Sequence, residues 1–483
     1  MLQQYINISK VRGDLKVKDF SRYETADLHA KDLKHNMHPF TDFASFKKEG
    51  SLIMAESDGA YVYDTEGKKY LDGIAGLWCV NIGYGVKEIG EAMAEQTRRI
   101  PYYSTFGPLT TPPAAELAAK LAALAPGNLN HVFFGTGGSM SNDTAVRMIH
   151  FYFNRLGKKD KKQIITRTDG YHGSTYLAMT LTGVEYDHIG FDLAPDLVHR
   201  VSAPNVYRRP DGMTEAEFCD FLVQEFEQKI LEIGPERVAA FFAEPIAGAG
   251  GVLVPPEGYH QRIDAICKKY EVIHVADEVV TAFGRLGEMF SCEKIFGYTP
   301  DIITCAKGLT SGYIPLSANL ISEEIYDVIS MPQAKGAMFT HGFTYSGHPV
   351  STAVGIKNIE IIERLDICGH VRKVGKYFEN QLKERISSLP LVGDVRGSHF
   401  MMCVENVANK ETKELLPDDV QIGNRIAAKC EENGVLIRPL AHKNIMSPPL
   451  ILSADEVDLI VNTLHQGICD VQDDLVREGV WKG

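Results

Sequence analysis

The chain has 483 residues, of which 44% are hydrophobic and 23% are charged, and its formal net charge is −13. This composition is typical of a globular protein, and the length suffices for one large domain with a smaller companion. The negative charge, without a long run of Lys or Arg, argues against a nucleic-acid-binding protein, because the phosphate backbone requires a positive face.

The sequence pattern also argues against a membrane or secreted protein. No apolar run approaches the roughly 18–20 residues that span a bilayer, and the first residues contain no apolar core of a secretory signal. The nine cysteines form no Cys-x-x-Cys pair, which favours reduced thiols over a disulfide scaffold or a metal site. We therefore expect a cytoplasmic protein, and we interpret the basic residues Lys158, Lys159, Lys161 and Lys162 as a solvated loop.

The N-terminal part of the chain offers few clear elements. The first fifty residues are polar and lack periodicity, so we expect an irregular arm that lies on another part of the molecule. Alternating apolar residues in Ala60–Tyr70, with Glu66-Gly67 at the turn, predict a β-hairpin. The Ala- and Leu-rich segment Pro112–Leu124 predicts a helix, because prolines open it and Pro126-Gly127 follows it.

The middle of the chain alternates short apolar runs with helical segments such as Ala216–Ile233 and Gly258–Tyr270. This alternation predicts an α/β fold with a mainly parallel sheet that is covered on both faces. The seven candidate strands are His131–Phe134, Gln163–Arg167, Leu197–Val201, Val238–Ala243, Val272–Ala276, Asp301–Cys305 and Leu316–Ile321.

From about Ser346 the pattern changes to a long helix, Ser351–Leu365, a second helix, and short strands near Phe400–Val404 and Val435–Arg438. We expect a smaller α+β domain here. The predicted division is residues 1–79 as an N-terminal arm and part of the small domain, 80–345 as the large domain, and 346–483 as the C-terminal small domain.

A glycine-rich loop follows the first strand of the predicted sheet. Gly135–Ser139 leads into a helix, and small residues at a helix N-terminus let backbone N–H groups approach an anion. The loop matches neither the dinucleotide fingerprint nor a P-loop, and a simple tight turn is the alternative. Because ligands bind at the carboxyl ends of strands in open α/β sheets, a phosphate-binding loop is the functional interpretation.

Two further strand ends carry an acid and a lysine. Asp277 ends the apolar strand at Val272–Ala276, where a carboxylate is costly to bury unless a cation or a protonated nitrogen pairs with it. Lys307 follows the strand Asp301–Cys305, where apolar surroundings can lower the pKa of its amine, as Schiff-base chemistry requires. Each could be a surface residue, but the three strand ends in this order favour a single site. His274, in the middle of its strand, is interpreted as a packed core residue.

At these residues the sequence resembles the class III aminotransferases, which depend on pyridoxal phosphate (PLP). The resemblance covers nearly the whole chain from about Leu52 onward. It rests on Asp277–Val279, Phe283–Gly287, Pro300-Asp301, Lys307, Tyr171–Gly173, Ala243–Pro245 and His341–Pro349. It implies fold type I of the PLP-dependent transferases.

The resemblance implies a role for each matching residue. Lys307 binds the cofactor covalently and moves a proton between substrate and cofactor, and Asp277 pairs with the protonated pyridine nitrogen, which makes the ring an electron sink. The other residues implied at the cofactor are Gly138 and Ser139 at the phosphate, Tyr171 and Val279 on the two ring faces, His172, Glu244, and Thr344, which reaches the phosphate of a neighbouring subunit. The resemblance therefore also implies a homodimer or a dimer of dimers.

Two positions depart from the family pattern. Met140 stands where the family has a glutamate in the phosphate loop, and Ala282 replaces a common glycine. Neither position carries PLP chemistry, so we expect the cofactor to bind, with a pocket edge of different shape near Met140.

Two residues resemble the branch that transfers amino groups from amines or ω-amino acids to pyruvate. Trp78 matches an aromatic residue that shapes the pocket, although it could be a core residue only. Arg438 matches a mobile arginine that pairs with the carboxylate of the keto acid, although it could be a surface charge. Glu244 is a candidate partner for Arg438 when no carboxylate is bound.

The expected activity is a ping-pong transfer from an amine donor to a keto acid, with pyruvate giving alanine. Alternatives are an aminomutase or racemase on the same fold, or an aminotransferase that uses another keto acid. A non-catalytic protein of this fold would be expected to lack Lys307 or Asp277, and both are present. The sequence does not choose among β-alanine, diamines, taurine and aromatic amines as the donor.

Overall fold

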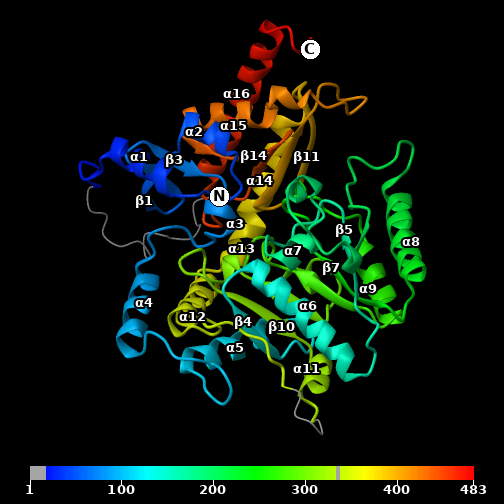
Figure 1. Ribbon diagram of the computed structural model, residues 1–483. Helices are drawn as coiled ribbons and strands as arrows, with labels where there is room; N and C mark the ends of the chain where they lie inside the picture. The colour runs from blue at the N-terminus through cyan, green and yellow to red at the C-terminus, as the bar shows by residue number, and fades with distance from the viewer. Residues whose placement is uncertain (1–17, 333–337, 483) are drawn as a thin grey trace.

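The computed structural model describes residues 18–332 and 338–482. Its centre is a seven-stranded sheet in the order β4-β10-β9-β8-β7-β5-β6 (Figure 1). β10 runs antiparallel to β4 and β9, and the remaining pairings are parallel. The strands are β4 (His131–Gly135), β5 (Gln163–Arg167), β6 (Val198–Val201), β7 (Val238–Ala243), β8 (Ile273–Asp277), β9 (Ile302–Cys305) and β10 (Ser317–Ile321). The predicted mainly parallel sheet is confirmed, with all seven candidate strands in it.

Helices cover both faces of this sheet. On one face, α6 (Gly138–Arg155) and α11 (Glu323–Ser330) pack in one buried cluster with Phe242 of β7. On the other face, α8 (Glu215–Ile233) and α9 (Tyr259–Lys269) pack with Phe241. Successive residues of a strand point to opposite faces, so each face of β7 supplies its own core. Figure 1 shows α8 and α9 together on one side of the sheet, with α6 in front.

Two smaller sheets lie beside the large one. They have the orders β1-β2-β3-β13 and β11-β12-β15-β14. Because β3 pairs in parallel with β13, a segment from the N-terminal part of the chain shares a sheet with a segment from the C-terminal part. The domain boundaries themselves stay a prediction. The strands are β1 (Met54–Asp58), β2 (Tyr61–Asp64), β3 (Lys69–Asp72), β11 (Val392–Ser398), β12 (Met401–Asn406), β13 (Val435–Leu436), β14 (Arg438–Leu440) and β15 (Lys443–Met446).

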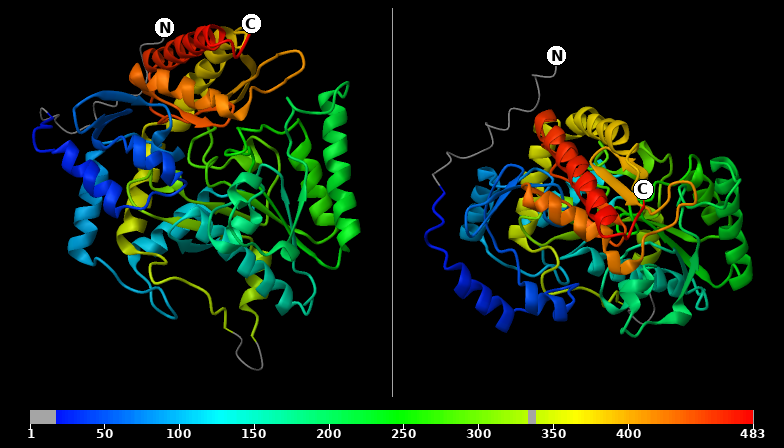
Figure 2. Two further views of the ribbon diagram at one scale, coloured as in Figure 1. Left: turned by 45° about the horizontal axis from the view of Figure 1, so that its top comes forward. Right: turned by 90° about the horizontal axis from the view of Figure 1, so that it is seen from above.

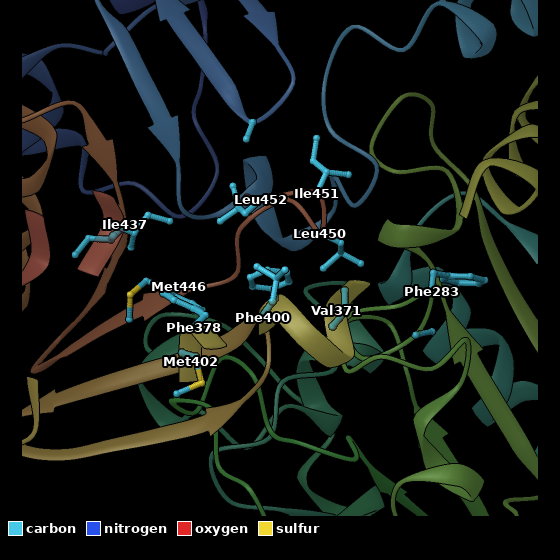
Figure 3. Close-up of a cluster of buried hydrophobic side chains, with 14 of the residues drawn as sticks. Phe283, Val371, Phe378, Phe400, Met402, Ile437, Met446, Leu450, Ile451 and Leu452 are labelled. Carbon is cyan, nitrogen blue, oxygen red and sulfur yellow. The ribbon is translucent and has the colours of Figure 1, made fainter. Parts of the chain in front are cut away.

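The largest apolar cluster joins the large sheet to the smaller ones. Figure 3 shows Phe283, from the loop after β8, in line with Leu450 and Phe400. The helix α16 (Ala454–Arg477), drawn in red, lies at the top of the molecule in the left view of Figure 2 and faces the viewer in the right view, which looks down from above. The other helices are α1 (Thr25–His35), α2 (Phe43–Glu49), α3 (Ala75–Trp78), α4 (Lys87–Arg99), α5 (Pro112–Leu124), α7 (Tyr176–Leu181), α10 (Ser291–Lys294), α12 (Pro349–Arg364), α13 (Ile367–His370), α14 (Lys376–Ile386), α15 (Ile422–Glu432) and α16 (Ala454–Arg477).

Three local expectations need correction. The described part of the N-terminal arm contains α1 and α2, and neither helix has a fully buried residue, so no apolar stripe revealed them. The run Val435–Arg438 is not one strand: β13 and β14 belong to different sheets. Lys161 is not solvated, because it is buried and its Nζ donates to the carbonyls of Pro235 at 2.7 Å and Tyr270 at 3.1 Å.

The expected hairpin, free thiols and core histidine are present. The predicted hairpin forms, with β2 antiparallel to β3 and Gly67 at φ +86° in the turn. All nine cysteines are free, and His274 is fully buried in the core. Within the described ranges, no helix is both long and apolar enough to cross a bilayer. The same residues contain no group of His, Cys, Asp and Glu side chains arranged to hold a metal ion.

Candidate active site

Asp277 is the last residue of β8, and only 3% of its surface is exposed. Its Oδ2 accepts a hydrogen bond from Asn142 Nδ2 at 2.8 Å and lies 2.8 Å from His172 Nδ1. Its Oδ1 accepts a hydrogen bond from the Val279 backbone N–H at 3.2 Å. Buried carboxylates need such partners, so the strand-end acid predicted from the sequence is both buried and oriented.

Asn142 is a site residue that the sequence reasoning missed. It is buried in α6, and its Nδ2 also donates to the His172 carbonyl at 2.7 Å. The same amide therefore fixes the Asp277 carboxylate and the backbone next to its histidine partner. A signal for this role was present, because Asn142 is three residues after Ser139 and so lies on the same helix face as the phosphate loop.

Lys307 follows β9 and opens a short 3-10 turn. Its φ of +40° lies in the left-handed region, which costs an ordinary L-residue about 1–2 kcal/mol. Burial lowers the pKa of the Lys307 amine, and the Asp277 carboxylate acts in the opposite direction. A lysine whose pKa is lowered by burial is suited to act as a nucleophile or a base.

The glycine-rich loop and the end of β8 meet at Gly138, the first residue of α6. A Cβ at Gly138 would lie only 3.0 Å from Val279 Cγ1, so the loop packs directly on the residue after Glu278. Ser139 Oγ accepts a hydrogen bond from the Ser174 backbone N–H at 3.0 Å, which leaves its own proton free to be donated. The helix N-terminus and this hydroxyl together form a cradle of donors of the kind that suits an anion.

Glu244 follows β7 and is 5% exposed. One of its carboxylate oxygens accepts from the Tyr171 backbone N–H at 2.9 Å, and the other accepts from the Gly248 N–H at 2.8 Å. Burial raises the pKa of Glu244. The structure does not bring Glu244 and Arg438 into an ion pair, and the two backbone hydrogen bonds explain why the carboxylate has no need of one.

Arg438 and Trp78 lie on the small-sheet side of the site. Arg438 begins β14 and is partly buried; burial lowers the pKa of its guanidinium, while Tyr171 and Asp187 oppose this shift. Among the described residues no carboxylate forms an ion pair with Arg438. Trp78 is 6% exposed and packs in a cluster with Ile246, Val252, Leu286 and Met401.

Thr344 lies in the segment that precedes α12. Its side chain is exposed, and its carbonyl accepts a hydrogen bond from Tyr102 Oη at 2.8 Å. The neighbouring surface carries large exposed rings, since Tyr102, Phe106 and Tyr345 are 40%, 55% and 58% exposed.

These groups fit PLP by their chemistry. Asp277 offers a buried, oriented carboxylate to a protonated ring nitrogen, and Lys307 offers an amine to the cofactor aldehyde. The Gly138–Ser139 cradle offers neutral donors to a phosphate. Val279 contacts this cradle, and Tyr171 is tied to the same region through Glu244.

Comparison with known proteins gives an independent result. The model of the family "Aminotransferase class-III" matches residues 44–468. The chain is 40% identical to a putrescine–pyruvate aminotransferase from Pseudomonas aeruginosa, over 91% of this chain and 95% of that protein. It is 39% identical to gamma aminobutyrate transaminase 3 from Solanum lycopersicum, over 96% and 88% of the two chains.

A solved structure agrees with the fold. The omega transaminase from Pseudomonas jessenii in complex with PMP superposes with a TM-score of 0.90 at 38% identity, covering 92% of this chain and 98% of that chain. The match extends over the large sheet and the smaller ones together.

Proposed function

The chain belongs to the class III aminotransferases, and on that basis we propose that it moves an amino group from an amine or an ω-amino acid to pyruvate, giving alanine. Enzymes of this family depend on PLP. The observation that carries the choice of acceptor is Arg438, a partly buried guanidinium beside Tyr171 without an ion-pair partner among the described residues.

The bound cofactor supplies an electron sink that stabilises negative charge on the substrate carbon. Asp277 would hold the ring nitrogen in its protonated form, because contacts with Asn142 and His172 fix the position of its buried carboxylate. Ser139 and the N-terminus of α6 would bind the phosphate, and Tyr171 and Val279 would flank the ring. These assignments use only groups that already converge on one edge of the sheet.

Lys307 would bind the cofactor and then accept and return a proton at Nζ. Its lowered pKa favours the neutral amine that both tasks require. Both half-reactions would use this amine, so the donor and the keto acid would occupy the same pocket in turn. Arg438 would orient the keto acid through its carboxylate by charge-assisted hydrogen bonds.

The donor is the open part of the proposal. The relatives include both a putrescine–pyruvate aminotransferase and gamma aminobutyrate transaminases, which favours a donor with a terminal amino group. Incubating the holoenzyme with pyruvate and a panel of putrescine, γ-aminobutyrate, β-alanine, taurine and 1-phenylethylamine, and measuring alanine, tests the proposal. At least one donor should give alanine, and Lys307→Ala should give none. Isomerised amine without any keto acid would instead indicate an aminomutase.

We also propose a homodimer, or a dimer of dimers, in which Thr344 reaches the phosphate of the neighbouring subunit. The exposed rings of Tyr102, Phe106 and Tyr345 beside Thr344 support this assembly, because a large apolar surface of this kind is typical of an interface. A cytoplasmic location stays a prediction.

A further inference from the structure

The turn that carries Lys307 has an unfavourable backbone. Lys307 has φ +40° and Ser311, at the other end of the turn, has φ +50°. Two non-glycine residues in the left-handed region within five positions persist only where the surroundings hold them. The conformation of this turn decides where the Lys307 amine points.

One side chain makes three hydrogen bonds to this turn. Asn358 lies in α12 and is fully buried. Its Nδ2 donates to the Gly308 carbonyl at 2.8 Å and to the Leu309 carbonyl at 3.0 Å. Its Oδ1 accepts from Ser311 Oγ at 2.6 Å. One side-chain amide is thus hydrogen-bonded to three of the four residues that follow Lys307.

The turn also contacts Asn81, which is buried. Its Nδ2 donates to the Phe283 carbonyl and its Oδ1 accepts from Arg285 Nη2, both at 2.9 Å. A Cβ at Gly308 would overlap Asn81 Nδ2, so the turn lies directly against this amide. Gly308 therefore has no room to shift toward Asn81.

We propose that Asn358 is a positioning residue for Lys307: its side-chain amide holds the turn Lys307–Ser311 in the conformation that aims the amine at the cofactor and the substrate. The inference rests on the proposed role of Lys307 and extends it to a residue that touches neither cofactor nor substrate. Because α12 begins just after the Thr344 segment, the helix would link the turn to the proposed subunit interface.

The test compares the pH titration of the visible cofactor band in the holoenzyme. Asn358→Leu keeps the volume and removes all three hydrogen bonds. The pH midpoint should rise by about half a unit or more, because a relaxed turn admits water around the Lys307 nitrogen that is joined to the cofactor, and solvation favours its protonated form. The amine half-reaction should slow by about 10-fold or more, as expected for a misplaced catalytic group.

Asn406→Leu is the matched control. Asn406 is also fully buried, and its Nδ2 donates to the His442 carbonyl and to Asn444 Oδ1, both at 2.9 Å, in the small sheet. It should lose thermal stability without a change in the titration. Ser311→Ala removes the bond to Asn358 Oδ1 and the acceptor that lies 3.3 Å from the Ile82 backbone N, but it keeps the two bonds from Asn358 to the carbonyls. It should give a smaller shift in the same direction, so it decides the question if Asn358→Leu does not fold.

Two outcomes separate the positioning role from the role of Lys307. If borohydride reduction of the wild-type holoenzyme fails to label Lys307, the proposed function of the lysine is wrong. If Lys307 is labelled but Asn358→Leu and Ser311→Ala titrate like the wild type, or Asn406→Leu shifts equally, Asn358 has only a structural role.

Discussion

At the scale of single residues, the candidate site residues were predicted mainly from their positions at the ends of strands. Asp277 and Lys307 were identifiable because a charged side chain at the end of a buried strand needs a partner or a task. Asn142 and Asn358 were not, because their hydrogen bonds join segments that are far apart in the sequence. An asparagine inside a helix gives no sign of its distant partner, so these two proposed roles required the structure.

The first prediction concerns the keto-acid anchor. Arg438→Ala should cost about 2–4 kcal/mol of pyruvate binding, because a charge-assisted bond in a partly desolvated pocket is lost. The KM for pyruvate should therefore rise far more than the KM for 1-phenylethylamine, which has no carboxylate. Arg364→Ala is the control, since this exposed arginine pairs with Glu88 on the surface. Equal losses for both substrates in single-turnover assays would mean that the anchor lies elsewhere.

A second residue-scale prediction concerns Asp277. Asp277→Ala should leave some cofactor bound through Lys307 and the phosphate cradle but slow turnover by about 100-fold or more, because the ring loses the charge that keeps its nitrogen protonated. Absorbance spectra and stopped-flow rates of the amine half-reaction report the two effects separately. A variant that turns over like the wild type would remove Asp277 from the mechanism.

At the scale of elements, buried strands were predictable and solvent-facing helices were not. The inner strands β7, β8, β9 and β10 are buried along their whole length, whereas α1 has no buried residue and therefore no apolar stripe. The split between β13 and β14 was not predictable either, since sheet membership depends on partners that are distant in sequence.

The phosphate cradle gives a prediction at this scale. Gly173 has φ +134°, and a Cβ there would overlap Ser139 Oγ and lie 2.7 Å from Ser139 Cα. Gly173→Ala should therefore displace the cradle and weaken cofactor affinity by about 10-fold or more, as the loss of a charge-assisted hydrogen bond would. In Gly137→Ala the new methyl group meets nothing within 4 Å, and the extended backbone accepts it. Equal PLP dissociation constants in the two variants would contradict this account.

The loop between α6 and β5 gives a pH-dependent prediction. Burial lowers the pKa of Lys161 from 10.5 to about 8. Between these values the unfolded chain binds more protons than the folded chain, so the Lys161 contribution to the free energy of unfolding increases as pH rises. The free energy of unfolding of the wild type, relative to that of Lys161→Met, should therefore increase from pH 8 to pH 10 by at most about 3 kcal/mol. The exposed residue Lys159 is the control; a difference that does not change with pH would contradict the burial of Lys161.

At the scale of the whole molecule, the site is predicted to be complete only in an assembly. The holoenzyme should scatter light with at least twice the mass of one chain, and Phe106→Glu should weaken the association because it places a charge in the exposed aromatic surface. In Phe106→Glu, cofactor affinity should fall together with the mass measured by light scattering. A fully active monomer would exclude the proposed role of Thr344.

The most direct test of the central claim is a two-step single turnover. An active amine donor, added to the holoenzyme without a keto acid, should abolish the visible cofactor band. Pyruvate added next should restore the band and release one equivalent of alanine per site. Lys307→Ala should support neither step at a comparable rate. A band that no amine donor changes, or that pyruvate does not restore, would contradict amino transfer from an amine to pyruvate through Lys307.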